Sequence, residues 1–222
     1  RRADRLQELT GLQPGRIRVI PADLTDQAAL QRLRELLAEE KPQIRLLINA
    51  AGYAKIGPNS ELAPADCAGM IDLNCRAAAE ITQMALPYMS RGSRIIEICS
   101  TAAFQPFPYL GIYAASKAFL YSYSRSLRWE LQTKGISVTA ACPYWIRDTE
   151  FIPVMRKEER RPYVRHFPLA GTCRNTARRI MTDSRLNLSV STPGPVCTLH
   201  RFFAKIFPDD LLMMIWEGLR RL

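Results

Sequence analysis

The chain is poor in the side chains from which metal sites and disulfide frameworks are built. It has two histidines, His166 and His200, and neither has another ligand-type residue at a useful spacing. Its six cysteines form no Cys-x-x-Cys motif, so the pattern predicts neither a metal site nor a set of disulfides. Free cysteines are typical of a reducing compartment, and the cytoplasm is the expected location.

Internal repeats, low-complexity tracts and long apolar runs are also absent. The most apolar stretch, residues 201–222, is interrupted by Pro208, Asp209 and Asp210 and is too short to span a bilayer. Because basic residues flank its apolar side chains, it could lie on a membrane surface or cover an apolar substrate. We expect instead that it packs on a binding pocket or on a second subunit.

Acidic residues are the minority among the charges. The chain has 31 basic and 21 acidic residues, a formal net charge of +10. A nucleic-acid-binding protein would gather its basic residues on one element together with stacking aromatics, whereas these arginines are spread along the chain. The densest basic cluster, at 156–165, is interrupted by Glu158 and Glu159 and fits a solvated loop. We therefore predict no nucleic-acid partner.

The order of apolar segments predicts an α/β fold. Strand-like runs lie at 16–20, 44–49, 94–100, 136–142 and 187–191, and they alternate with helical patterns at 26–40, 65–90, 111–134 and 174–183. Such alternation indicates a doubly wound parallel sheet with helices on both faces. At 222 residues and 47% hydrophobic, the chain can bury one core and gives no reason for a second domain.

Tyr113 and Lys117 form the most informative pattern. Residues four apart on a helix share one face, so the ammonium of Lys117 can lie beside the phenol of Tyr113 and favour its ionised form. A free phenol titrates near pH ~10, which is too high for proton transfer at neutrality unless a nearby charge lowers it. The pair alone would also fit an amphipathic helix with a half-buried tyrosine and a solvated lysine.

Other polar residues follow the strand-like runs directly. Ser100 follows the run 95–99, and Asn49-Ala50-Ala51-Gly52 begins where the run 46–48 ends. In open α/β sheets ligands bind outside the carboxyl ends of the strands, so these residues are placed for chemistry.

These motifs, in this order, resemble the short-chain dehydrogenase/reductase family over nearly the whole chain. The matching pieces are Asp23-Leu24, Asn49-Ala50-Ala51-Gly52, Asn74, Ser100, Tyr113, Lys117 and Cys142-Pro143. The resemblance implies a Rossmann-like sheet. It also implies an NAD(P)-dependent oxidoreductase that interconverts a ketone or aldehyde and an alcohol on a small to medium apolar substrate.

The resemblance further implies four catalytic residues. Tyr113 would exchange a proton with the substrate oxygen, and Ser100 would hydrogen-bond the same oxygen. Lys117 would bind the nicotinamide ribose and lower the pKa of Tyr113. Asn74 would hold a water that links Lys117 to solvent.

A dinucleotide site is implied in the same way. Asp23, next to Leu24, would meet the adenine amino group. The remaining residues of the implied cofactor site are Asn49, Ala50, Gly52, Tyr113, Lys117, Pro143 and Thr149. Arg1 and Arg2 would meet a 2′-phosphate, which favours NADP over NAD, although a solvated helix start would look the same.

Several of these residues have structural alternatives. Ser100 could cap the end of a strand, and Asp23 could belong to the turn before the helix that starts near residue 26. Asn74 is the most telling, because it lies on the apolar face of a predicted helix and a buried amide must find partners. A bound water and a neighbouring backbone would supply them.

Two features depart from the family pattern. The glycine-rich turn that receives the pyrophosphate is missing, and with it one βαβ unit of on the order of 30 to 40 residues. We therefore expect a fragment of a longer protein that binds dinucleotide poorly and is inactive by itself. In addition, Tyr144 and Trp145 replace the glycine expected after Pro143.

Two adjacent aromatics cannot share one face, so we expect at least one of Tyr144 and Trp145 to line the substrate pocket rather than pack in the core. Residues 144–170 would form a substrate lid. The helix at 111–134 carries an apolar stripe that begins with Phe119 and Tyr123, and in the family this helix often pairs across a dimer axis. We expect a homodimer or homotetramer, with a non-catalytic binding or scaffold protein as the alternative.

Overall fold

A computed structural model describes residues 3–157, 159 and 161–221 of the chain. The chain divides into two compact units, residues 1–41 and 42–222, and each is described by itself.

The first unit holds two helices, α1 (Ala3–Thr10) and α2 (Gln27–Glu40). Asp26 caps α2, because its carboxylate accepts a hydrogen bond from the backbone N–H of Ala28 at 3.0 Å. The helix ends at Lys41, whose left-handed backbone lets its N–H donate to the carbonyl of Leu37. The predicted helix at 26–40 is therefore confirmed.

The predicted strand at 16–20 does not form. Residues 17–20 belong to neither a helix nor a strand, and each strand of the described sheet lies in the second unit. A strand is stabilised by hydrogen bonds to a neighbouring strand, and in the described part of the chain this segment pairs with none. An apolar run alone does not supply that partner.

The second unit contains a parallel sheet of four strands in the order β1-β2-β3-β4. The strands are β1 (Ile44–Asn49), β2 (Met89–Ile98), β3 (Ser137–Ala141) and β4 (Val190–Ser191). The helical elements are α3 (Pro64–Ile71), η1 (Asp72–Ala77), α4 (Ala78–Ala85), η2 (Leu86–Tyr88), η3 (Thr101–Ala103), α5 (Gly111–Gln132), α6 (Phe151–Arg156), α7 (Cys173–Arg185), α8 (Pro195–Ile206) and α9 (Asp209–Leu219).

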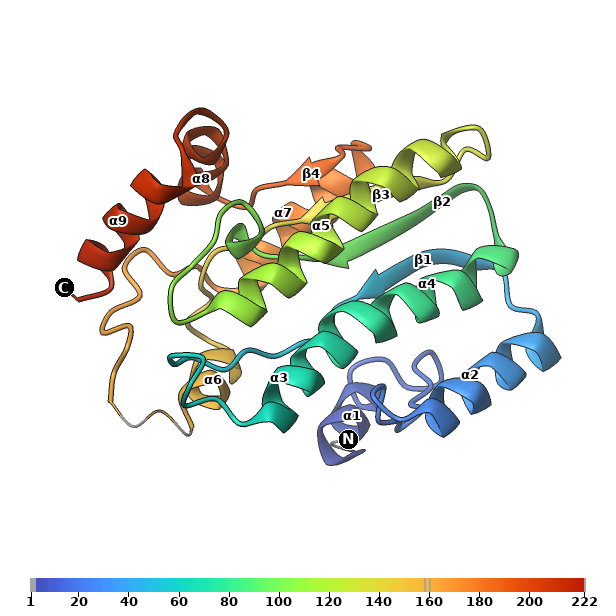
Figure 1. Cartoon of the computed structure of the whole chain (residues 1–222). Helices are drawn as coiled ribbons and strands as arrows, with labels where there is room; N and C mark the ends of the chain where they lie inside the picture. Colours follow the sequence, from blue (N-terminus) through green and yellow to red (C-terminus); the bar gives the residue numbers. More distant parts are fainter. Residues whose placement is uncertain (1–2, 158, 160, 222) are drawn as a thin grey trace. The chain divides into compact units, whose positions relative to one another are not determined.

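Helices cover both faces of this sheet. Ile95 of β2 packs against Leu127 on the face covered by α5. The next residue, Ile96, packs against Ile180 of α7 on the opposite face. Figure 1 shows α4 and α5 on one side of the strands and α7 on the other. The alternation of side chains along β2 thus yields the doubly wound α/β arrangement that the sequence predicts.

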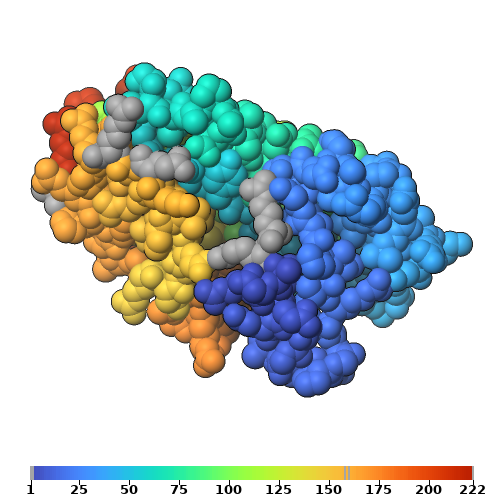
Figure 2. Space-filling view, turned by 90° about the horizontal axis from the view of Figure 1, so that it is seen from below, coloured from blue at the N-terminus to red at the C-terminus, as the bar shows by residue number. Residues whose placement is uncertain are grey.

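The strand register brings the carboxyl ends of the strands to one edge. Ile98 pairs with Ala141, and Ala141 pairs with Ser191, so three neighbouring strands end almost level. The segments that follow them therefore meet at this edge. Between residues 144 and 170, yellow to orange in Figure 2, many of the described residues lie at the surface of this unit, whereas Met155, Tyr163 and Val164 are buried. In the described part of the chain, no helix has the length and apolar character needed to cross a bilayer.

The sheet core can be tested at Ile96, whose side chain is completely buried between β2 and α7. We expect Ile96→Ala to lower the free energy of unfolding by about 2–5 kcal/mol, because it removes apolar contacts and leaves a cavity. Met214→Ala, at a side chain that is 71% exposed, should change it by less than about 0.5 kcal/mol. Urea unfolding measures both values, and equal losses in the two variants would contradict this core.

Candidate active site

A cavity of about 890 Å³ opens at the carboxyl edge of the sheet. Its walls come from the segments after β1, β2 and β3, from α5, and from α8 and α9, all in the second unit. The sequence-predicted residues that line it are Ala50, Gly52, Ser100, Tyr113, Lys117, Pro143, Tyr144, Trp145 and Thr149. Asn49 and Asn74 are not among the lining residues.

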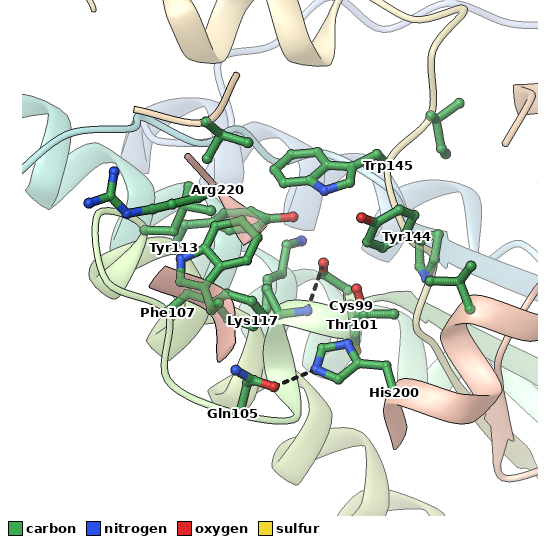
Figure 3. A pocket seen from close by; sticks show the side chains of 18 of the residues that line it. Cys99, Thr101, Gln105, Phe107, Tyr113, Lys117, Tyr144, Trp145, His200 and Arg220 are labelled. Carbon is green, nitrogen blue, oxygen red and sulfur yellow. Dashed lines mark hydrogen bonds between the residues drawn. The ribbon is translucent and has the colours of Figure 1, made fainter. Parts of the chain in front are cut away.

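Helix α5 carries the Tyr113 and Lys117 side chains to the cavity. Both are buried, and the Lys117 ammonium lies 5.8 Å from the centre of the Tyr113 ring. Lys117 Nζ donates a hydrogen bond of 2.8 Å to the carbonyl of Ile98 at the end of β2, and Figure 3 shows this bond. The Tyr113 ring also packs against Phe151 of α6 at 5.7 Å. The helix and the strand end are thereby held together at the cavity wall.

Burial dominates the proton chemistry of this pair. It raises the pKa of the Tyr113 phenol to about 12, although a hydrogen bond with the Ser100 hydroxyl pulls the pKa down. Burial also lowers the pKa of Lys117. Desolvation outweighs the other influences on the phenol, so the net pKa lies above its ordinary value, and a lowering of the Tyr113 pKa by Lys117 stays a prediction. At neutral pH Tyr113 holds its proton and can donate it.

Ser100 both caps a helical turn and faces the cavity. Its hydroxyl oxygen accepts a hydrogen bond of 3.1 Å from the backbone N–H of Ala102, which fixes the start of η3. The same side chain interacts with the phenol of Tyr113. The capping alternative and the site prediction therefore do not exclude each other.

Asn74 lies in η1, a π-helical turn between α3 and α4. It is completely buried. Its Oδ1 accepts from the backbone N–H of Tyr53 at 3.1 Å, and its Nδ2 donates to the Tyr53 carbonyl and to Ser116 Oγ, both at 3.0 Å. The neighbouring backbone thus supplies the partners that a buried amide requires. The water relay through Asn74 stays a prediction.

Gly52 leaves room where a side chain would collide. A Cβ atom at this position would lie 2.9 Å from Asn74 Oδ1 and 3.3 Å from Lys117 Nζ. The Cβ direction of Gly52 is therefore filled by Asn74 and Lys117, and the glycine itself lines the cavity with its backbone beside the buried ammonium. Such a surface suits the close approach of a ribose or another hydroxyl-rich group, so the residues present fit a nucleotide cofactor.

Asn49 turns away from the cavity into the core. Its Nδ2 donates to Glu97 Oε1 and to Thr82 Oγ1, both at 2.8 Å. The side chain of Asn49 therefore fixes the turn from the core side, and the role of this turn in packing against a cofactor stays a prediction. Glu97 was not singled out from the sequence, yet it is completely buried, and burial raises its pKa to about 7. The positive charge of Lys117 pulls that pKa down.

Asp23 and Leu24, two further predicted cofactor residues, lie in the first unit, at the turn before α2. Asp23 Oδ1 accepts hydrogen bonds from the N–H of Thr25 at 3.0 Å and from its hydroxyl at 2.7 Å, in the turn before α2 that includes Leu24. This is the structural alternative stated for Asp23, and an adenine contact stays a prediction. Arg1 and Arg2 lie outside the described residues.

The substrate side of the cavity is aromatic. Tyr144 and Trp145 both line it, and the Trp145 ring packs on Phe167 at 4.7 Å. The C-terminal segment contributes Phe203, Phe207, Leu212, Ile215, Trp216 and Leu219, which confirms that it packs on a pocket. Sequence reasoning missed Gln105 and His200, whose hydrogen bond of 2.7 Å joins residues 95 positions apart. No local pattern indicates such a pair.

The bare backbone at Gly52 can be tested by substitution. We expect Gly52→Ala to lower the free energy of unfolding by roughly 1–3 kcal/mol, because Asn74 must leave its hydrogen bonds to accommodate the Cβ. Gly111→Ala is the matched control, since a Cβ there meets nothing within 4 Å. Thermal unfolding compares the variants, and a Gly52→Ala protein as stable as Gly111→Ala would contradict the close approach.

Glu97 predicts a pH dependence of stability. Its folded pKa of about 7 lies above the ordinary 4.5, so the folded protein holds a proton that the unfolded chain loses. Its contribution is therefore fully present below pH 4.5 and is lost as the pH rises to about 7, on the order of 3 kcal/mol in all. Urea unfolding across this range should show the loss in wild type and in Glu130→Gln, an exposed control, but not in Glu97→Gln. An unchanged slope in Glu97→Gln would refute the assignment.

The sequence is similar to those of known dehydrogenases and reductases. Sulfoacetaldehyde reductase 2 of Chromohalobacter salexigens is 34% identical over 157 residues, which cover 68% of this chain and 62% of that protein. Serine 3-dehydrogenase of Agrobacterium fabrum is 34% identical over 154 residues, covering 68% of this chain and 61% of that protein. The chain thus spans about six tenths of the length of these relatives.

Solved structures share the fold. A short-chain dehydrogenase from Streptomyces avermitilis superposes with a TM-score of 0.76 at 21% identity, covering all of this chain and 86% of that one. A serine dehydrogenase complexed with NADP+ superposes with a TM-score of 0.66 at 32% identity, covering 72% of this chain and 65% of that one. The model of the short chain dehydrogenase family matches residues 1–160. The chain therefore belongs to the short-chain dehydrogenase/reductase family.

Proposed function

We propose that the whole protein is an NAD(P)-dependent oxidoreductase that interconverts a ketone or aldehyde and an alcohol. One observation carries the proposal: the Tyr113 phenol, the Ser100 hydroxyl and the Lys117 ammonium line a single cavity with apolar walls. A proton donor, a second hydroxyl and a buried cation are the groups that carbonyl reduction requires. The non-catalytic alternative has no observation in its favour.

In this proposal Tyr113 is the catalytic acid and base. Its raised pKa keeps the phenol protonated at rest, so it can give its proton to a carbonyl oxygen during reduction and take it back during oxidation. Ser100 would donate a second hydrogen bond to the same oxygen. Lys117 would stabilise the tyrosinate left behind, and Asn74 would support proton exchange with solvent. The aromatic walls at Tyr144 and Trp145 would exclude water from the reacting oxygen.

A nicotinamide dinucleotide would supply or accept the hydride when bound. Its nicotinamide and ribose would lie against Ala50, Gly52, Lys117, Pro143 and Thr149, which line the cavity, and Asp23 would receive the adenine. We propose NADP rather than NAD. Support comes from Arg1 and Arg2 in the sequence and from a relative named NADP-dependent 3-hydroxy acid dehydrogenase in Escherichia coli K12.

We further propose one catalytic domain with residues 144–170 as its substrate lid, a cytoplasmic location and a homodimer or homotetramer. The six free cysteines support the reducing compartment. On α5, Phe119 is 46% exposed and stacks on Tyr123 at 6.2 Å, which suits a face that a second subunit covers.

The test removes a single oxygen atom. In Tyr113→Phe of the whole protein we expect kcat/KM for ketone reduction to fall about 10³-fold, because the proton donor is lost while the ring contact with Phe151 remains. Tyr121→Phe, on the same helix but outside the cavity lining, should keep wild-type kinetics. The loss of reduced-nicotinamide absorbance follows the reaction. Wild-type turnover by Tyr113→Phe would rule out the proposed role.

A further inference from the structure

A hydrogen-bonded pair of polar side chains lies inside the largely aromatic cavity. Gln105 follows η3 and His200 lies on α8, and both line the cavity. Figure 3 shows the two joined to each other, on the far side of Lys117 from Trp145. Neither group has a part in the proton chemistry proposed above.

We propose that His200, oriented by Gln105, binds a hydroxyl group at the far end of an uncharged, mainly apolar substrate. This inference rests on the proposed function and names the substrate class: a ketone or alcohol that carries a second hydroxyl remote from the reacting oxygen.

The pair leaves His200 with one acceptor nitrogen. Gln105 Nε2 donates to the carbonyl of Pro106 at 3.4 Å, which turns its Oε1 toward His200. Since Oε1 can only accept, His200 Nε2 carries the hydrogen in the 2.7 Å bond between them. In neutral histidine the other nitrogen, Nδ1, is then an acceptor. A ligand hydroxyl is the complementary donor.

Aromatic contacts fix the plane of the His200 ring. The rings of Phe104 and Phe107 each meet it edge to face, with centroids 5.8 Å away and interplanar angles of 82° and 89°. Phe107 packs in turn edge to face on Trp216 at 4.9 Å. The histidine is therefore held from α8, from the segment after η3 and from α9. A polar group so confined costs little further entropy when a ligand binds it.

The charges of the lining argue against an anionic substrate. Burial lowers the pKa of His200, so the ring is neutral at physiological pH. The Arg220 guanidinium is paired with Glu217, donates to the carbonyl of Tyr163 at 3.1 Å and lies 3.9 Å over the Tyr109 ring. The Lys117 ammonium donates to the Ile98 carbonyl and lies 5.8 Å from the centre of the Tyr113 ring, where the proposed function assigns its charge to the tyrosinate. The remaining basic side chain of the lining, His166, is exposed.

The remaining walls match an extended apolar body. Phe107, Trp145, Leu212, Ile215 and Trp216 line the part of the cavity that the proposed cofactor residues do not occupy, and all five present apolar surface. A ligand that reaches both Tyr113 and His200 buries its apolar middle against these side chains. The two polar ends then set its orientation, so that one oxygen faces the phenol.

The experiment measures how much a distal hydroxyl group strengthens ligand binding, and whether this gain in affinity depends on His200. The probes are phenylcyclohexanone and its para-hydroxyphenyl analogue, with decanol and decanediol as a flexible second pair. Binding is followed by tryptophan fluorescence, because Trp145 and Trp216 line the cavity, and by calorimetry. In wild type we expect the hydroxyl to strengthen binding about tenfold in at least one pair, which is the size of one buried hydrogen bond.

The affinity gain from the hydroxyl should vanish in His200→Phe, which lacks the acceptor nitrogen. It should shrink in Gln105→Leu, because the leucine cannot accept the hydrogen bond that fixes the tautomer of His200. Lys205→Gln, an exposed change on the same helix, should keep the full gain. Circular dichroism checks that each variant folds, and Gln105→Leu carries the comparison if His200→Phe does not fold. Equal binding of hydroxylated and parent probes to wild type, or a full gain in His200→Phe, would overturn the proposal.

The binding readout separates this inference from the proposed function. If the affinity gain depends on His200 but the protein turns over no ketone, the proposed oxidoreductase activity is wrong and the hydroxyl-binding site stands. If turnover depends on Tyr113 but the hydroxyl brings no affinity gain, the oxidoreductase activity stands and the hydroxyl-binding site is wrong. A para-carboxyphenyl analogue should bind more weakly than the hydroxyl probe, and tighter binding of this anion would also overturn the proposal.

Discussion

The hydrogen bond from Lys117 Nζ to the Ile98 carbonyl is the contact on which the site depends. It joins the second turn of α5 to the end of β2. The rotation of the helix about its own axis is therefore fixed relative to the sheet. Tyr113, one turn earlier, then faces the same cavity as Ser100, which follows β2 directly. A buried ammonium is stable only when it is hydrogen-bonded, so the lysine cannot leave this carbonyl without cost. Chemistry and folding therefore share one contact.

The burial of Lys117 and Tyr113 also explains why the Tyr113 phenol keeps its proton at neutral pH. Packing that holds Lys117 and Tyr113 in place also removes water from both, which lowers the lysine pKa and raises that of the phenol. Beneath them Glu97 is buried as well, and its partners Asn49 and Thr82 do not prevent its pKa from rising to about 7. Each group in this region resists ionisation. A ligand that brings charge or hydroxyls to Gly52 changes the environment of all of them.

Residues whose positions follow from local geometry could be predicted from the sequence. The shared helix face of Tyr113 and Lys117 follows from their spacing, and the place of Ser100 follows from the apolar strand before it, whereas their chemical roles came from the family resemblance. The direction of the Asn49 side chain could not be predicted, because it depends on the pairing with Glu97 of the neighbouring strand, which turns it into the core. The strand expected at 16–20 failed for the same reason, since strand formation requires a partner. The net rise of the Tyr113 pKa could not be predicted either, because spacing reports proximity, whereas desolvation depends on the whole surrounding packing.

The cavity separates chemistry from recognition along the chain. The proposed reacting groups lie after β2 and on α5, in the middle of the sequence, and the sheet fixes their positions. The proposed recognition groups come from described residues after β3 and from α8 and α9, far along the chain, where the walls pack on the sheet edge without joining it. Apolar side chains on α8 and α9 stay partly exposed to solvent. Phe203 is 42% and Ile215 is 50% exposed, although both line the cavity. Because no strand register constrains these helices, their side chains can change the accepted substrate while the bond from Lys117 to Ile98 keeps the proton donor in place.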